Sequence, residues 1–271
     1  MPPQMRALPT SYSREALGRY AEIIPVAQRG VELARTSGLG GPRGEWMASY
    51  WLICLAALGR WREAEELAVG LRDLTDGTTE DLSLASVAVI LIRQGRLDEA
   101  RPVVERLRSI WERTKWAETL ASAVVPVIMF DAAEGRVDGA VDLVERQLER
   151  RGGIGDIRSE VVATGIAVLA DHTGPQPSRR DRQSASQATA TAGRWLACID
   201  DVDSTAPAPT IVMSAHRDHA RANFARLRGE SDDRRWSALV ARWVELGFPY
   251  EEADARHHLA VQPARRRRST R

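Results

Sequence analysis

Three stretches of this chain repeat one pattern, and that pattern limits the folds that the chain can adopt. They read LGRWREAEELAVGL at Leu58–Leu71, QGRLDEARPVVERL at Gln94–Leu107 and EGRVDGAVDLVERQL at Glu134–Leu148. A fainter copy begins at Gly18 and has Ile23 where the others have alanine. The shared positions are a glycine, the arginine after it and an alanine five residues after the glycine: Gly59, Arg60 and Ala64; Gly95, Arg96 and Ala100; Gly135, Arg136 and Ala140. The steps between the four glycines are 41, 36 and 40 residues, which is the range of proteins built from repeated helical hairpins.

Each glycine lies between an apolar segment and an acidic turn. The segments Trp46–Leu58, Leu82–Ile92 and Leu120–Ala133 are rich in alanine, leucine, isoleucine and valine, which predicts helices that are buried on two sides. The glycine permits the left-handed conformation that ends a helix. Acids in the next first turn favour the positive end of the helix dipole: Glu63, Asp98, Glu99 and Asp138.

The segment after each glycine carries one apolar stripe, as an amphipathic helix does. In the first two copies the stripe continues three, four and seven residues beyond the alanine, at Leu67, Ala68 and Leu71 and at Val103, Val104 and Leu107. In the third copy Leu143 and Val144 occupy the first two of these positions. We expect the alanine where the two antiparallel helices of a hairpin cross closely. One hairpin cannot bury its apolar faces alone. The sequence therefore predicts an all-α protein of antiparallel hairpins stacked in a right-handed solenoid.

Further helices are expected in the second half of the chain. They cover Arg158–Asp171, Gln187–Ile199 and Ile211–Arg228, and Ser231–Asp233 offers an N-cap signal for another. A loop is expected over Asp200–Thr210. The predicted organisation is hairpin repeats over 1–172, a polar Pro- and Ser-rich loop over 173–186, hairpins of the same array over 187–262, and a basic disordered tail over 263–271.

Glycine followed by a small residue five positions later, inside helix pairs of this length, resembles the tetratricopeptide repeat. The chain departs from that family in two respects. The proline that usually ends each repeat is absent, and the steps exceed 34 residues, which implies longer loops or helices.

The segment Trp236–Ala260 carries a second resemblance. It reads WSALVARWVELGFPYEEADARHHLA, and it resembles the C-terminal repeat region of the large ATP-binding LuxR-type transcription regulators, the signal-transducing ATPases with tetratricopeptide repeats. The matching residues are Trp236, Trp243, Leu246, Gly247, Pro249, Tyr250, Ala253, Ala255, Arg256 and Leu259. The resemblance implies a cytoplasmic interaction or signal-sensing arm. Its concave helical surface would bind a protein or peptide partner or a small-molecule inducer.

The modules that flank these repeats in that family have no counterpart in the sequence. No GxxxxGK[ST] motif occurs, and GGIGD at Gly152–Asp156 lacks the lysine and hydroxyl residue of a phosphate cradle. Past Ala260 the chain reads VQPARRRRSTR, and Pro263 is expected to end the helix. These departures suggest a truncated or stand-alone arm of such a regulator.

Two pairs of histidines are candidates for chemistry. His216 and His219 are three residues apart and can share a metal on one helical face, but no third ligand is evident. A solvated helical face is the preferred interpretation for them. His257 and His258 are adjacent and are expected on the surface. No catalytic, cofactor-binding or metal site is predicted, so a metal-dependent enzyme is the least favoured function.

The basic run Arg265–Arg268 supports one alternative, direct DNA binding. A net charge of +1 gives no general attraction to nucleic acid, so the run is more simply interpreted as a solvated tail. The eight tryptophans are expected to be mostly core residues, and one or two of them could line a groove: Trp46, Trp51, Trp61, Trp111, Trp116, Trp195, Trp236 and Trp243.

The cysteines and the apolar segments of the sequence indicate the cellular compartment of the protein. Cys54 and Cys198 lie in apolar helical contexts without metal-ligand spacing, which predicts two reduced, buried thiols in a cytoplasmic protein. The first residues contain no apolar core of a signal peptide. The longest apolar run, Leu120–Phe130, is too short to cross a bilayer.

Overall fold

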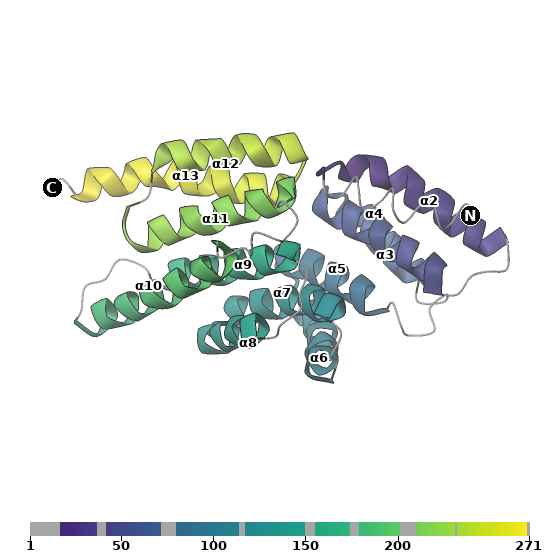
Figure 1. Cartoon of the computed structure of the whole chain (residues 1–271), viewed down its shortest axis with the longest axis horizontal. Coiled ribbons are helices and arrows are strands. Elements are labelled where there is room, and N and C mark those ends of the chain that lie inside the picture. Colours follow the sequence, from purple (N-terminus) through teal and green to yellow (C-terminus); the bar gives the residue numbers. More distant parts are fainter. Residues whose placement is uncertain are drawn as a thin grey trace. The chain divides into compact units, whose positions relative to one another are not determined.

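The computed structural model describes residues 17–36, 42–71, 80–113, 117–149, 155–173, 179–200, 210–230 and 232–269 (Figure 1). Over these ranges the chain forms helices joined by turns, and none of these residues lies in a strand. The predicted all-α class is confirmed. The helices are α2 (Tyr20–Thr36), α3 (Pro42–Ala57), α4 (Trp61–Leu71), α5 (Glu80–Arg93), α6 (Leu97–Arg113), α7 (Ala117–Ala133), α8 (Val137–Glu149), α9 (Gly155–His172), α10 (Arg179–Asp200), α11 (Ile211–Leu227), α12 (Asp233–Leu246) and α13 (Pro249–Ser269).

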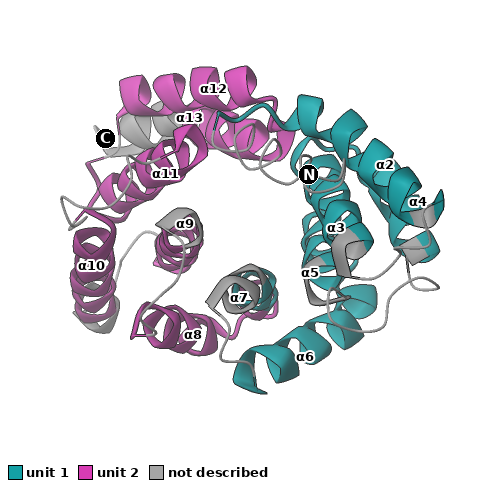
Figure 2. Ribbon diagram, turned by 45° about the vertical axis from the view of Figure 1, so that its right-hand side comes forward, with its two compact units in different colours: residues 1–130 teal, residues 131–271 magenta. Residues whose placement is uncertain are grey.

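The chain divides into two compact units within α7. The first unit is Met1–Phe130 and the second is Asp131–Arg271 (Figure 2). The division therefore does not coincide with the polar loop expected over 173–186. Residues 179–186 of that stretch are helical, because α10 begins at Arg179. Residues 179–192 contain neither glycine nor proline, so nothing in this polar stretch interrupts a helix.

The glycines of the repeat end their helices as predicted. Gly59, Gly95 and Gly135 have φ of 69°, 73° and 76°, in the left-handed region. At each corner the amide of the following arginine donates to the carbonyl five residues back, for example from Arg60 to Leu55 at 2.9 Å. This pairing satisfies carbonyls that the end of a helix leaves without partners. Gly229 and Gly247 form the same corner in the second unit.

In the first unit each hairpin contacts the next. Helix α3 packs against α2, α4 and α5, and α5 packs against α4 and α6. Ala64 and Ala100 are fully buried, with no exposed surface. The arginine of each corner also pairs with a nearby acid, as in Arg96 with Glu99 at 2.7 Å. Arg96 pairs in addition with Glu65 of α4, so it connects two successive hairpins.

In the second unit, α9 packs against α8, α10 and α11, and α11 packs against α10 and α12. The helices α12 and α13 pack against each other. Gly165 of α9 lies where three helices approach closely. A Cβ atom at this position would lie 2.8 Å from Cγ2 of Val144 on α8 and 2.9 Å from Cζ3 of Trp195 on α10. Only a residue without a side chain fits there unless its neighbours move.

The C-terminal helix is longer than predicted. Helix α13 continues through Pro263 to Ser269, so the expectation that Pro263 ends the helix is wrong. The proline removes one backbone hydrogen bond. Alanine and arginine, which follow it, are strong helix formers.

The N-cap signal before α12 is confirmed at Asp232, whose Oδ1 accepts from the Arg234 amide at 2.9 Å. Within the part of the chain that the structure describes, no helix combines the length and the apolar character needed to cross a membrane.

Candidate functional site

The candidate site lies in the second unit and depends on how three helices begin and end. Helix α11 is capped at its N-terminus by Thr210, whose hydroxyl accepts from the Met213 amide at 3.1 Å. Helix α12 is capped at its C-terminus by Gly247, which has φ of 72°. Helix α13 then begins at Pro249, where proline has no amide proton to leave unpaired. These local signals bring the chain back on itself and place α13 against α12.

Helical spacing places the polar and aromatic side chains of these helices on facing stripes. On α11 the positions 216, 219, 223 and 226 are three or four apart, so they share one face. Trp236 and Trp243 are seven apart on α12. Asp254 and His258 are four apart on α13. We call the group formed by His219, Asn223, Arg226, Trp236, Asp254 and His258 the histidine cluster.

Two imidazoles share one carboxylate at the centre of the histidine cluster. His219 Nε2 lies 3.0 Å from Asp254 Oδ2, and His258 Nε2 lies 3.6 Å from Asp254 Oδ1. The two histidine side chains are only 11% and 10% exposed. The fully buried ring of Trp236 lies against both imidazoles, with its centroid 5.8 Å from that of His219 and 4.7 Å from that of His258.

An arginine lies beside the imidazoles. The Arg226 side chain is 7% exposed, and its Nη1 lies 2.7 Å from Asp171 Oδ1 at the end of α9. Its Nε donates to Asn223 Oδ1 at 3.0 Å. Asn223 is fully buried, and neither its Nδ2 nor Arg226 Nη2 has a hydrogen-bond partner among the residues that the structure describes. The histidine cluster thus holds more donors than acceptors.

These surroundings shift two pKa values. Burial opposes ionisation of Asp254, but the hydrogen bond from His219 and the nearby positive charges outweigh it and lower the pKa of this carboxyl. Burial lowers the pKa of His258, and the charge of Arg226 lowers it further, to about 4. His258 is therefore neutral at pH 7.

The structure corrects the expected positions of three histidines. His219 and His258 are buried and His216 is half-buried, whereas solvated faces were expected. Only His257 is exposed as predicted. The reason is tertiary: α11 and α13 both present these faces to the large rings of α12. Tryptophans seven residues apart were the available signal, because they indicate a helix that is covered along its length.

The structure does not bring His216 and His219 together as a metal-binding pair. The ring of His216 contacts Trp243, with centroids 5.3 Å apart, whereas His219 binds Asp254. Over the described residues, no three side chains of histidine, cysteine, aspartate or glutamate are arranged to hold a metal ion.

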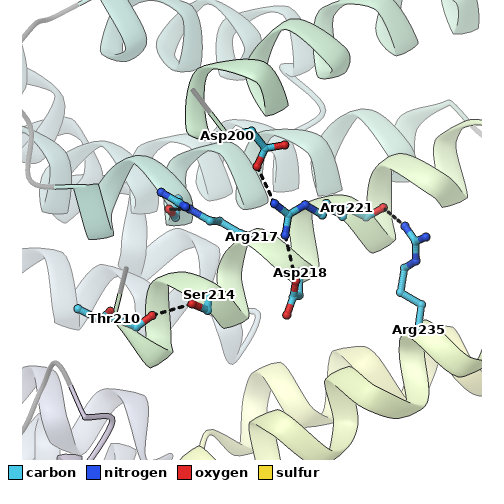
Figure 3. Close-up of polar contacts among 8 residues, drawn as sticks. Asp200, Thr210, Ser214, Arg217, Asp218, Arg221 and Arg235 are labelled. Carbon is cyan, nitrogen blue, oxygen red and sulfur yellow. Dashed lines mark hydrogen bonds and ion pairs between the residues drawn. The ribbon is translucent and has the colours of Figure 1, made fainter. Parts of the chain in front are cut away.

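A second polar group lies on the other side of α11 (Figure 3). Arg221 pairs with Asp200 of α10 at 2.6 Å and with Asp218 at 3.1 Å, and its carbonyl accepts from Arg235 of α12 at 3.4 Å. Arg217 donates to the buried Ser159 of α9 at 3.2 Å. Each arginine is occupied by groups of neighbouring helices, so this group joins helices.

The remaining candidates are distributed between core and surface. Cys54 is buried as predicted, but Cys198 is exposed on α10, so the prediction of two buried thiols is half wrong. Trp111, Trp195, Trp236 and Trp243 are buried, while Trp46, Trp51 and Trp61 are half-buried. Trp116 and Gly152 to Ile154 lie outside the described residues, as do the side chains of Arg265–Arg268.

Comparison of the chain with models of known protein families finds no match, and comparison with curated proteins finds none either.

Proposed function

We propose that the chain is a non-catalytic helical-repeat module that binds a protein, a peptide or a small molecule. In this proposal its hairpins stack as a tetratricopeptide-like right-handed solenoid, and the partner binds on the concave side. The module serves transcriptional control as a truncated or stand-alone arm of a LuxR-type regulator. That assignment rests on the sequence resemblance over Trp236–Ala260.

One observation carries the proposal: the same structural unit recurs three times. A left-handed glycine ends one helix at Gly59, Gly95 and Gly135, and an alanine of the next helix is buried five residues later. Recurrence of one unit at nearly constant spacing is typical of arrays in which each hairpin buries the apolar face of its neighbour. The contacts among α3, α4, α5 and α6 support the same arrangement in the first unit. Arrays of this kind commonly present extended concave binding surfaces.

The test compares two substitutions on α6 in the cell that naturally carries the chain. Ala100 is fully buried, and Ala100→Glu places a charge in the hairpin core. Arg106 is exposed on the same helix, so Arg106→Gln is the matched control. We expect deletion of the gene and Ala100→Glu to change the same transcripts, and the control to change none. The tagged wild-type chain should capture a partner that the Ala100→Glu variant loses. A deletion that alters no transcript contradicts the regulatory role.

A further inference from the structure

The position of His258 suggests a function that packing alone does not require. Its imidazole lies on α13, is 10% exposed and lies against the Trp236 ring of α12. Leucine or methionine fills such a position without a titratable group. The immediate neighbour His257 is exposed on the same helix, so the chain offers a natural comparison.

The charged and titratable groups around His258 come from three helices. Helix α11 contributes Arg226 and His219, α9 contributes Asp171, and α13 itself contributes Asp254. The exposed His257 ring is 5.4 Å from that of His258. From α12, the group in contact with it is the uncharged Trp236.

Each carboxylate near His258 already pairs more closely with another group. Asp254 already binds His219 at 3.0 Å, which is closer than its 3.6 Å approach to His258. Asp171 already binds Arg226 at 2.7 Å. A proton on His258 therefore adds a charge next to a buried guanidinium, in a cluster where donors already exceed acceptors.

We propose that His258 is an acid-sensitive contact: its neutral imidazole holds α13 against α11 and α12, and protonation of that imidazole releases the helix. The release is a local opening of α13 away from α11 and α12. A fall in pH thereby exposes the faces of α11 and α12 that α13 covers.

The direction of the effect follows from linkage. The pKa of His258 falls from its ordinary 6.5 to about 4 when α13 is in place. Between these two values the open state binds more protons than the closed state, so the contact is at full strength above pH 6.5 and weakens as the pH falls toward 4. The equilibrium shifts toward opening by about 30-fold at pH 5 and by at most about 300-fold at lower pH. Asp254 does not contribute in this window, because its pKa is lowered from 3.8.

Hydrogen exchange of the full chain tests the proposal. Exchange is followed by mass spectrometry at pH 7.5, 6.5, 5.5 and 5, and each rate is corrected for the intrinsic effect of pH on amide exchange. Peptides from residues 249–261 of α13 should lose about 30-fold of their protection by pH 5. Peptides from α8 of the same unit should not change. The variant His257→Gln should behave as wild type, and His258→Gln should show no pH-dependent loss in α13.

Either of two hydrogen-exchange results would contradict the proposal. The proposal fails if α13 of the wild type keeps its protection at pH 5, or if His258→Gln loses protection over the same pH range as wild type. A second measurement applies even where His258→Gln does not fold at neutral pH. The His258 ring of the wild-type chain is titrated by nuclear magnetic resonance, and we expect a midpoint well below 6.5 that coincides with shifts in α13 amides. A midpoint near 6.5 without such shifts overturns the proposal.

Discussion

At the scale of single residues, identical positions of the repeat are used differently. Arg60 and Arg136 both follow a corner glycine, but their partners differ. Arg60 pairs at 2.5 Å with Glu63, which is 53% exposed. Position 139 is glycine, so Arg136 has no acid three residues ahead and turns back to Asp131, which is 3% exposed, at 2.8 Å. One sequence pattern therefore produces one solvated ion pair and one pair with a buried carboxylate.

This difference predicts unequal costs for the same substitution. Arg136→Ala removes two hydrogen bonds from the buried Asp131 carboxylate, and we expect it to lower the free energy of unfolding by about 1–3 kcal/mol. Arg60→Ala should change it little, because water replaces the partner of an exposed pair. Urea denaturation of both variants measures the difference. Equal costs would contradict the role assigned to burial.

At the scale of elements, glycine has two separate uses in this chain. Corner glycines such as Gly95 and Gly135 supply a left-handed backbone in open space, since a Cβ there would meet no atom within 4 Å. Gly165 instead lies inside α9 and makes room for side chains of α8 and α10. The first use has a signal in the sequence, because glycine precedes arginine between two helical patterns. The second use has none, since it depends on which helices meet.

Two glycine-to-alanine substitutions should therefore change stability in opposite directions. Gly165→Ala forces the buried Val144 and Trp195 side chains to move, and we expect a net loss of about 1–2 kcal/mol in unfolding free energy. Gly70 lies in the last turn of α4, and a Cβ there meets nothing within 4 Å. Gly70→Ala should raise stability by about 0.5–1 kcal/mol, because alanine is the better helix former. Thermal and urea unfolding of both variants provide the test, and stabilisation by Gly165→Ala would contradict the close approach of the three helices.

At the scale of the whole molecule, positive and negative charges are balanced, and the boundary between the two compact units does not lie in the most polar segment. Positive and negative side chains number 38 and 37. The boundary between the compact units lies between Phe130 and Asp131, inside a helix rather than in the polar stretch after residue 172. Hydrophilic composition alone thus does not locate a boundary between units.

The balanced charge predicts that the whole chain does not bind DNA. We expect no retention on duplex DNA at about 50 mM salt, where contacts with phosphates are strong. A chain that ends at residue 264 and lacks the Arg265–Arg268 run is the matched comparison. Retention that falls with salt and disappears in the shortened chain would favour the alternative function, direct DNA binding.

The sequence by itself determined the helices and their corners. Glycine at Gly59, Gly95 and Gly135, acids in the next first turn and the aspartate cap of α12 act within a few residues, so their effects can be recognised in a linear pattern. It also indicated which faces are apolar, since Val104, Leu107, Leu143 and Val144 of the expected stripes are buried. Local polarity misled where it conflicted with helix propensity, as in residues 179–186 and around Pro263.

Only the tertiary structure decided the environment of the histidines. In the sequence, His219 and His258 stand 39 positions apart among charged residues, and each resembles a surface residue. The folding of α11, α12 and α13 against one another places them on one carboxylate, beside Trp236 and Arg226. Burial and nearby charges shift the pKa of an imidazole only when groups that are distant in the chain come within a few ångströms of it. For this reason the helices could be predicted from their own residues, whereas the histidine cluster could not.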